Sequence, residues 1–362
     1  MGDKLLGVVE ELARSRVPGL CVAVAHEGAV TLVQPAGVAS VSERRPTTPD
    51  TAFLWFSMTK IATATAAVRL AESGALGLDD PVADYVPEFP RSQSGPPVTV
   101  RHLLNHTAGL ANPIPVGWVH PASQPGPDPH QFAIDLVRRK PKVAKQPGTR
   151  ASYSNLGYVV LGEVLTAAAG RRYEDYVRDQ ILKPLGMSRT DYGYTAALTT
   201  DLATGHQPRL HPLTPLLRLM VPAGVVGPSH GRWLTFNRFV VDGAAYGGLI
   251  GSAADAARFL AMHTGDGVFE GTRIVSPEGA RAMRELTAHG RKLRVGLGWF
   301  NRSSGPSSEE FVEHLGGGGG FWNMMRLYPR HKLGVLAMGN ATSYDHQRLA
   351  DAALEDFTAS PG

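Results

Sequence analysis

The sequence is poor in cysteine: Cys21 is the single cysteine among 362 residues. One thiol cannot form an internal disulfide, and it cannot build a cysteine-ligated metal cluster. Cys21 stands inside the apolar run GLCVAVA. This setting favours a buried structural thiol, because a reactive thiol needs an exposed, electropositive environment. We therefore expect a fold without disulfides.

The sequence also lacks the segments that bring a chain to a membrane. It has no run of 18 apolar residues, so no transmembrane helix is expected. The first residues, MGDKLLGVVEELARSRVPG, have an amphipathic helical pattern without the basic start, apolar stretch and cleavage site of a secretory signal. Leu6 stands where the myristoylation pattern needs Ser or Thr. These absences predict a cytoplasmic protein without membrane insertion.

Charge of one sign is only slightly in excess, with 36 Lys and Arg against 32 Asp and Glu. The densest basic run is RRKPKVAK, from Arg138 to Lys145. It lacks interleaved aromatic residues and a recognisable binding module, so a solvated helix end followed by a loop is favoured over a nucleic-acid patch. We expect no nucleic-acid partner. The composition, 43% hydrophobic and 19% charged, is typical of a globular protein long enough for two domains.

Strand-like runs lie at both ends of the chain, and helical patterns lie between them. GLCVAVAHEG and AVTLVQPAG indicate two strands joined at Glu27-Gly28, and four short strand-like runs precede a closing helix at about Tyr344 to Phe357. This order predicts an α/β (α+β) fold, with one antiparallel sheet built from both chain ends, flanked by helices, and an inserted, mostly helical region. We assign residues 1–75 and 245–362 to the sheet domain and 76–244 to the inserted domain. A cleft is expected where they meet.

Two stretches do not fit this scheme. Residues 111–130 contain six prolines and predict a loop. Residues 205–245 show no clean period, and we interpret them as a cap or rim over the cleft. Their residues Trp233, Phe236 and Phe239 would either contact an acyl or aromatic group of a substrate or simply pack on the domain. Both alternatives remain open.

The stretch FLWFSMTKIATATAAVRLAESG places a serine and a lysine one helical turn apart. Ser57 opens the expected helix and Lys60 follows with S-x-x-K spacing, so both side chains share one face. A serine hydroxyl becomes a useful nucleophile when a neighbour takes its proton. Lysine can do this if burial or nearby positive charge lowers its pKa from ~10.4. The small and apolar residues after Lys60 favour a desolvated position.

Alone, S-x-x-K is a weak signal, because a serine N-cap followed by a surface lysine has the same spelling. Two further motifs add weight: Y-x-N at Tyr153-Ser154-Asn155 and H-x-G at His314-Leu315-Gly316. This ordered set resembles the three signature motifs of the serine beta-lactamase and penicillin-binding-protein superfamily, in its class C-like branch. The resemblance extends over nearly the whole chain, and it implies a beta-lactamase/transpeptidase-like fold.

The resemblance also implies roles for the motif residues. Ser57 would be the acylated nucleophile, and Lys60 would share its proton network. Tyr153 would be the partner base, with a phenol pKa lowered by Lys60 and by His314. Water would then resolve the acyl-enzyme, and no metal or cofactor would be needed.

Four residues are assigned to substrate binding on the same basis: Asn155, His314, Gly316 and Gly317. Asn155 would orient the carbonyl side of the substrate. The backbone N–H groups of Ser57 and Gly317 would form the oxyanion hole. The glycines after residue 316 would leave room for a substrate chain beside the strand.

The third motif departs from the K-T-G of beta-lactamases. A lysine is a permanent charge that can hold a substrate carboxylate, whereas a histidine with a free pKa of ~6.5 is mostly neutral at pH 7. His314 therefore weakens the case for penicillins. We predict a family VIII-type carboxylesterase for small or medium acyl esters. A D-amino-acid peptidase or amidase, a weak beta-lactamase or an acyltransferase would use the same residues, so the choice between ester and amide substrates, like the oligomeric state, remains open.

Two other patterns predict different sites but are weaker. His102 and His106 have the spacing of helical zinc ligands, yet HLLNH lacks the Glu of H-E-x-x-H. We interpret His106 as support for the wall of the site. GPSHG at 227–231 matches the nucleophile elbow G-x-S-x-G. Pro222 and Pro228 disfavour a strand before Ser229, so we predict a rim loop there.

Overall fold

The computed structural model describes residues 2–91, 95–110, 112–139, 145–210, 214–302 and 310–359, without the side chains of residues 215, 216 and 218. Most of the basic run from Arg138 to Lys145 lies outside these ranges. Its first two residues, Arg138 and Arg139, are exposed at the end of a helix. No helix within the described ranges is long and apolar enough to cross a bilayer.

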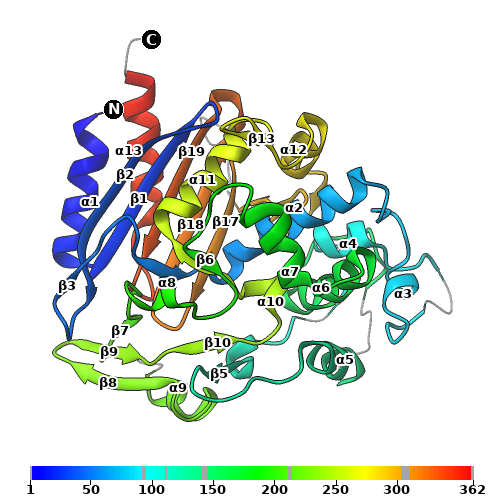
Figure 1. Cartoon of the computed structure of the whole chain (residues 1–362), viewed down its shortest axis with the longest axis horizontal. Coiled ribbons are helices and arrows are strands. Elements are labelled where there is room, and N and C mark those ends of the chain that lie inside the picture. Colours follow the sequence, from blue (N-terminus) through cyan, green and yellow to red (C-terminus); the bar gives the residue numbers. More distant parts are fainter. Residues whose placement is uncertain are drawn as a thin grey trace.

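A nine-stranded antiparallel sheet is the central layer of the molecule (Figure 1), in the order β14-β15-β16-β17-β18-β19-β1-β2-β3. The N-terminal β1 pairs with β19 near the C-terminus, so both chain ends build the sheet, as predicted. The strands are β1 (Gly19–His26), β2 (Ala29–Ser40), β3 (Arg45–Pro46), β14 (Ala288–His289), β15 (Arg294–Val295), β16 (Phe300–Asn301), β17 (Val312–Gly318), β18 (Phe321–Tyr328) and β19 (Leu333–Gly339).

The predicted hairpin between β1 and β2 is confirmed. His26 pairs with Ala29, which leaves Glu27 and Gly28 as a two-residue turn with φ values of 48° and 82°. Two consecutive positive φ values are those of a type I′ turn, and glycine adopts them without strain. The local sequence therefore sets the register of the first two strands.

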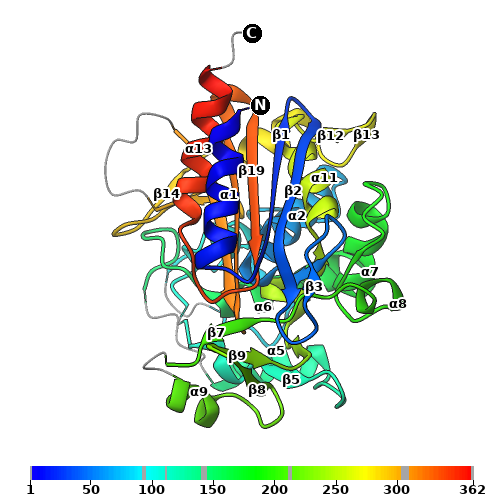
Figure 2. The same ribbon diagram turned by 90° about the vertical axis from the view of Figure 1, so that its left-hand side faces the viewer.

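Both faces of β1 are covered, which explains its uninterrupted apolar sequence. One face packs under α1 (Asp3–Ser15) and α13 (His346–Ala359), which lie side by side over the sheet in Figure 2. The other face belongs to the main core, with α2 (Thr59–Glu72) and α11 (Ala253–Thr264). Cys21 lies in this core, so its expected burial is confirmed, and burial raises the pKa of its thiol to about 12.

Between the two sets of strands the chain is largely helical. In α6 (Asn155–Ala169) the sequence sets both ends: the Ser154 side chain accepts the Gly157 N–H at 3.0 Å at the start, and Gly170 ends the helix with a left-handed φ of 63°. The remaining helices are α3 (Val82–Tyr85), α4 (Val100–Leu104), α5 (Pro129–Arg139), α6 (Asn155–Ala169), α7 (Tyr173–Val177), η3 (Arg178–Leu182), α8 (Ala196–Thr199), α9 (Thr214–Met220), α10 (Ala244–Gly247) and α12 (Pro277–Arg284), with short turns η1 (Phe56–Met58), η2 (Pro115–Gly117) and η4 (Pro329–His331). The boundaries at 75/76 and 244/245 stay a prediction.

Two segments that the sequence predicts as loops contain strands, so those predictions are wrong. In the proline-rich stretch 111–130, β5 (Val119–Pro121) pairs with β10 (Phe239–Val241). Ser229 lies in β8 (Val226–His230), which pairs with β9 (Trp233–Phe236). Pro228 is tolerated there because β8 is the edge of the sheet β7-β9-β8 and its register shifts between Val226 and Ser229. The other short strands are β4 (Ala52–Leu54), β6 (Thr190–Asp191), β7 (His206–Pro208), β11 (Ile250–Ser252), β12 (Val268–Phe269) and β13 (Thr272–Arg273).

A buried ion pair joins β17 to β18. Glu313 Oε2 accepts from Arg326 Nη2 at 2.6 Å and from its Nε at 3.1 Å, and the two side chains are 3% and 2% exposed. Arg326 also donates to Gln347 Oε1 at 2.6 Å. Water cannot solvate either charge, so each depends on the other. Because His314 follows Glu313, this pair supports the strand that carries the H-x-G motif.

We predict that Glu313→Ala lowers the free energy of unfolding by about 3–5 kcal/mol, because Arg326 is left charged, buried and unpaired. Urea unfolding followed by circular dichroism measures the loss. Glu10→Ala is the matched control, since it removes an ion pair with Arg14 whose side chains are 75% and 69% exposed. That change should cost less than about 1 kcal/mol. Equal losses for the two variants would contradict the prediction.

Candidate active site

Ser57 lies in the short turn η1, between β4 and α2. The backbone is held on both sides of it: the Trp55 N–H donates to the Leu249 carbonyl at 2.9 Å, and the Met58 N–H donates to the Trp55 carbonyl at 3.2 Å. Phe56 has a left-handed φ of 48°, which costs free energy in a residue other than glycine. Such strain is concentrated at functional sites. Here it stands directly before the predicted nucleophile.

The side chain of Lys60 is fully buried and has three polar neighbours. Its Nζ lies 2.7 Å from the Tyr246 carbonyl oxygen, 3.0 Å from Asn155 Oδ1 and 3.1 Å from Ser57 Oγ. Burial lowers the pKa of Lys60 well below its usual value, and no acid among the described residues counteracts the shift. Burial therefore favours the neutral form of the amine, because an unpaired buried ammonium is costly.

A neutral amine accounts for all three contacts of Lys60. It has two N–H donors and one lone pair. The Tyr246 carbonyl and Asn155 Oδ1 can only accept, so they take the two donors. Toward Ser57 both directions are chemically open: Nζ donates to Oγ when it carries a third proton, and its lone pair accepts from the hydroxyl when the amine is neutral. The distance of 3.1 Å is within the range at which a general base takes a proton.

Tyr153 contacts both residues of the S-x-x-K motif. Lys60 Nζ lies 5.0 Å from the centroid of the Tyr153 ring, and the Tyr153 side chain forms a hydrogen bond with the Ser57 side chain. The predicted lowering of its phenol pKa is wrong. Burial raises the pKa of Tyr153, and the charge of Arg302 offsets this only in part. A neutral Lys60 offers no charge to stabilise a phenolate, so Tyr153 remains a phenol that can donate a proton.

His106 packs against Tyr153 and holds the backbone on both sides of it. Its ring lies 4.6 Å from the Tyr153 ring, its Nδ1 accepts the Ser154 N–H at 3.2 Å, and its carbonyl accepts the Ser152 N–H at 2.8 Å. The chain is thus held on both sides of Tyr153. His102 has a separate task, since its Nδ1 accepts the Thr99 N–H at the start of α4.

Arg302 is a residue of this site that the sequence did not indicate. Its guanidinium lies 5.5 Å from the ring centroid of Tyr153 and 4.8 Å from that of Phe300. The side chain is exposed. A lone arginine after a short strand carries no motif, so only the fold shows that its charge stands beside Tyr153.

Asn155 is the first residue of α6, and its side chain faces Lys60. Its backbone N–H donates to Asn112 Oδ1 at 2.9 Å, and its own Oδ1 accepts from Lys60 at 3.0 Å. Because the oxygen is turned toward Lys60, the Nδ2 donor is available to a substrate. Asn155 also lines the cavity next to Ser57.

His314 packs against Tyr153 and Phe300 and does not line the cavity next to Ser57. It is 1% exposed, and its ring is 6.0 Å from that of Tyr153 and 4.6 Å from that of Phe300. Nδ1 donates to the Leu315 carbonyl at 2.9 Å, and Nε2 has no partner among the described residues. Burial lowers the pKa of His314 well below its usual value, so the ring is neutral. A direct contact with substrate, as predicted, would require this side chain to be uncovered.

Gly316 and Gly317 lie where β17 passes the nucleophile. A Cβ on Gly316 would stand 2.0 Å from the Trp55 carbonyl oxygen, so this approach requires glycine. Gly317 is exposed and lines the same cavity as Ser57. The two residues expected to form the oxyanion hole therefore border one cavity.

The cavity next to Ser57 has a volume of about 390 Å³ and a mostly apolar wall. The wall comes from η2, β5, α9, the connection between α9 and β8, β9 and β10, and it contains Pro115, Val116, Val119, Leu217, Val221, Val225, Phe236 and Phe239. No described residue that lines it is an Asp, Glu, Lys, Arg or His. Segment 205–245 thus forms part of the rim. Of its three aromatic candidates, Phe236 and Phe239 line the cavity and Trp233 does not.

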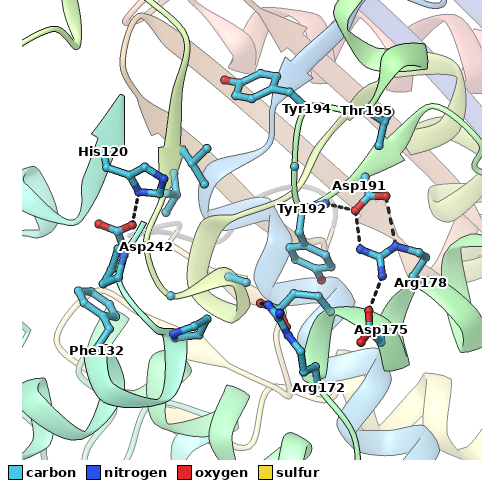
Figure 3. A pocket seen from close by; sticks show the side chains of 18 residues that line it. His120, Phe132, Arg172, Asp175, Arg178, Asp191, Tyr192, Tyr194, Thr195 and Asp242 are labelled. Atoms are coloured by element: carbon cyan, nitrogen blue, oxygen red, sulfur yellow. Dashed lines mark hydrogen bonds and ion pairs between the residues drawn. The ribbon is translucent and has the colours of Figure 1, made fainter. Parts of the chain in front are cut away.

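A second cavity of about 470 Å³ lies on the other face of the β5–β10 pair. Figure 3 shows His120 facing Asp242 on one side and Arg178 between Asp191 and Asp175 on the other. His120 Nδ1 is 2.6 Å from Asp242 Oδ1, and Arg178 Nη2 donates to Asp191 Oδ1 at 2.8 Å. None of the predicted site residues lines this cavity.

A chain of hydroxyl groups connects the second cavity with helix α2. Tyr192 lines the cavity, and its Oη lies 2.6 Å from that of Tyr173. Tyr173 Oη lies 2.8 Å from Thr63 Oγ1, which donates to the Ala245 carbonyl at 2.6 Å. The next carbonyl, that of Tyr246, is the acceptor of the S-x-x-K lysine. The chain therefore holds the part of α10 that contacts this lysine.

The geometry agrees with comparisons to known proteins. The model of the family described as Beta-lactamase matches residues 7–360. The chain belongs to the beta-lactamase family. It is 30% identical over 318 residues to Penicillin-binding protein 4* of Bacillus subtilis, covering 84% of this chain and 64% of that protein. It is 27% identical over 292 residues to the D-alanyl-D-alanine-carboxypeptidase/endopeptidase AmpH of Escherichia coli, covering 78% and 69%.

A solved structure shows the same family fold. The octameric penicillin-binding protein homologue from Pyrococcus abyssi superposes with a TM-score of 0.77 at 28% identity, over 99% of this chain and 77% of that one. This member of the beta-lactamase family is a serine hydrolase, as the motifs predict. The chain spans 64% of the length of the B. subtilis relative, slightly less than two thirds.

Ser57 and Ser229, the two serines with a nucleophile motif in this beta-lactamase family member, should differ in their effect on turnover. We predict that Ser57→Ala reduces kcat on p-nitrophenyl butyrate by at least about 10³-fold, because no other group can form the acyl-enzyme. Ser229→Ala is the matched control: Ser229 is exposed on β8, so turnover should be unchanged. Circular dichroism and thermal unfolding verify that both variants fold. Turnover at the wild-type rate in Ser57→Ala would refute the assignment of Ser57 as the nucleophile.

The pH dependence of kcat/KM tests the protonation states. Protonated Lys60 cannot accept the Ser57 proton, so activity should fall as the pH drops through the lowered pKa of Lys60 and reach a plateau above it. His106 and His314 should add no limb near pH ~6.5, since burial lowers their pKa values. The raised pKa of Tyr153 places any loss from phenol ionisation above pH ~10. Activity that rises only near pH ~10.4 would indicate a lysine of ordinary pKa.

Proposed function

We propose that this serine hydrolase is a carboxylesterase for small or medium acyl esters. The observation that carries the proposal is the cavity next to Ser57, which is mostly apolar and has no charged side chain in its described lining. An apolar acyl group suits such a wall, whereas a substrate carboxylate would find no charge there. The buried, neutral His314 adds none.

In the first half of the reaction, Ser57 Oγ attacks the ester carbonyl while its proton passes to the lone pair of Lys60. The backbone N–H groups of Ser57 and Gly317 stabilise the oxyanion that develops. The Nδ2 group of Asn155 donates to the substrate and orients it. Lys60 is a better proton acceptor than Tyr153 in this site, because burial favours the neutral form of both side chains.

Tyr153 completes the cycle as a proton donor. Its phenol protonates the departing alkoxide when the tetrahedral intermediate collapses to the acyl-enzyme, and protonated Lys60 returns a proton to the resulting phenolate. Water then attacks the acyl group and gives a proton to Lys60. When the second tetrahedral intermediate collapses, Lys60 passes that proton to Ser57 Oγ and the carboxylic acid is released. In this scheme the base, Lys60, and the acid, Tyr153, are both uncharged at the start of the cycle and again at its end.

A second candidate function, a D-amino-acid peptidase or a weak beta-lactamase, is favoured by Arg302. Its exposed guanidinium stands 5.5 Å from the Tyr153 ring centroid, outside the apolar wall. A leaving group that carries a carboxylate could pair with it. AmpH, a relative at 27% identity, has such a carboxypeptidase activity in its name.

A substrate panel separates these candidates. We predict hydrolysis of p-nitrophenyl acetate and butyrate and covalent labelling of Ser57 by a fluorophosphonate, both absent in Ser57→Ala. Activity should be lower on nitrocefin, D-amino-acid amides and D-Ala-D-Ala peptides. Arg302→Ser should leave ester hydrolysis intact, and a raised KM for the anionic substrates alone would support the second candidate. A protein that is inert on both esters and unlabelled by the probe is not the proposed esterase.

A further inference from the structure

Three large apolar side chains are exposed on the two segments that supply lining residues to the cavity next to Ser57. Ile114 is 75% exposed, Leu219 84% and Met220 44%. In sequence, Ile114 precedes the lining residue Pro115, and Met220 precedes the lining residue Val221. We call Ile114, Leu219 and Met220 the apolar rim.

Exposed apolar surface is concentrated at this rim. Among the side chains that the structure describes, the other exposed large apolar residue is Leu210, at 89%. Single exposed apolar residues are normal, but a group of them next to a concave apolar wall is typical of a ligand-binding groove. The rim comes from two separate segments, the start of η2 and the end of α9, so it is not one local run of sequence.

The position of Tyr153 indicates which part of an ester the cavity holds. Tyr153, the donor to the leaving group, does not line the cavity, whereas Ser57 and Gly317 do. The leaving alcohol therefore departs on the Tyr153 side. The acyl group, which stays bonded to Ser57 Oγ, occupies the cavity and points toward the rim.

We propose that the acyl chain fills this cavity and continues across the apolar rim, so that, within the proposed range of small and medium acyl esters, the enzyme prefers medium chains to acetate. The inference rests on the proposed esterase function and names its substrate class. Each methylene that leaves water for an apolar wall raises kcat/KM by roughly two- to fourfold. The gain should continue past the cavity itself, because Ile114, Leu219 and Met220 extend the apolar surface outward.

The test uses p-nitrophenyl esters from acetate to laurate, each at concentrations where it is monomeric. In the wild type, kcat/KM should rise with chain length. Ile114→Ser, Leu219→Ser and Met220→Ser should keep wild-type rates on acetate and butyrate and lose about fourfold or more on octanoate and laurate. Leu210→Ser is the matched control: it removes an equally exposed apolar side chain that adjoins no lining residue, so the profile should be unchanged.

Several results would overturn the inference and are distinguishable from failure of the proposed function. A flat chain-length profile with active esterase, or an equal loss in Leu210→Ser, removes the rim from substrate binding. A loss confined to emulsified ester or to lipid vesicles assigns the rim to a lipid surface instead. No hydrolysis of any ester and no labelling of Ser57 would overturn both the esterase function and the inference.

Discussion

The burial of Lys60 without a charged partner is the constraint on which the site depends. It favours the neutral amine, and a neutral amine can direct its lone pair at Ser57 because two acceptors, the Tyr246 carbonyl and Asn155 Oδ1, take its two donors. The same preference means that Lys60 adds no charge to ionise Tyr153, and Arg302 offsets the effect of burial only in part. The assignment of base and acid therefore follows from desolvation more than from the identity of the residues.

The sheet supplies the second requirement, which is the close approach of distant segments. β1 pairs with β19, so the chain ends build one layer, and β17 in that layer passes directly against the turn that carries Ser57. Gly316 permits the contact because any side chain there would meet the Trp55 carbonyl. The buried pair of Glu313 and Arg326 stabilises the same strand. Strand β17 therefore serves both the site, through Gly316, and the stability of the sheet, through Glu313.

Much of the fold and of the site was predictable, because the signals are local. The turn at Glu27-Gly28 and the S-x-x-K spacing need only a few residues to be recognised. The strand at Ser229 was not, since the tolerance of Pro228 depends on its place at a sheet edge. The direction of the Tyr153 pKa shift and the contact with Arg302 also escaped prediction. Both depend on burial and on neighbours far apart in sequence, which no motif encodes.

The hydroxyl chain that ends on α10 has a direction. The Ala245 carbonyl can only accept, so Thr63 donates to it; Tyr173 must then donate to Thr63, and Tyr192 to Tyr173. Each hydroxyl proton of the chain is therefore donated toward α10, whose next carbonyl, that of Tyr246, contacts Lys60. The oxygen of Tyr192 is left with acceptor capacity alone at the wall of the cavity in Figure 3. To a molecule that enters this cavity, Tyr192 can therefore offer only a lone pair, which suits an ammonium or an amide N–H and does not suit a carbonyl.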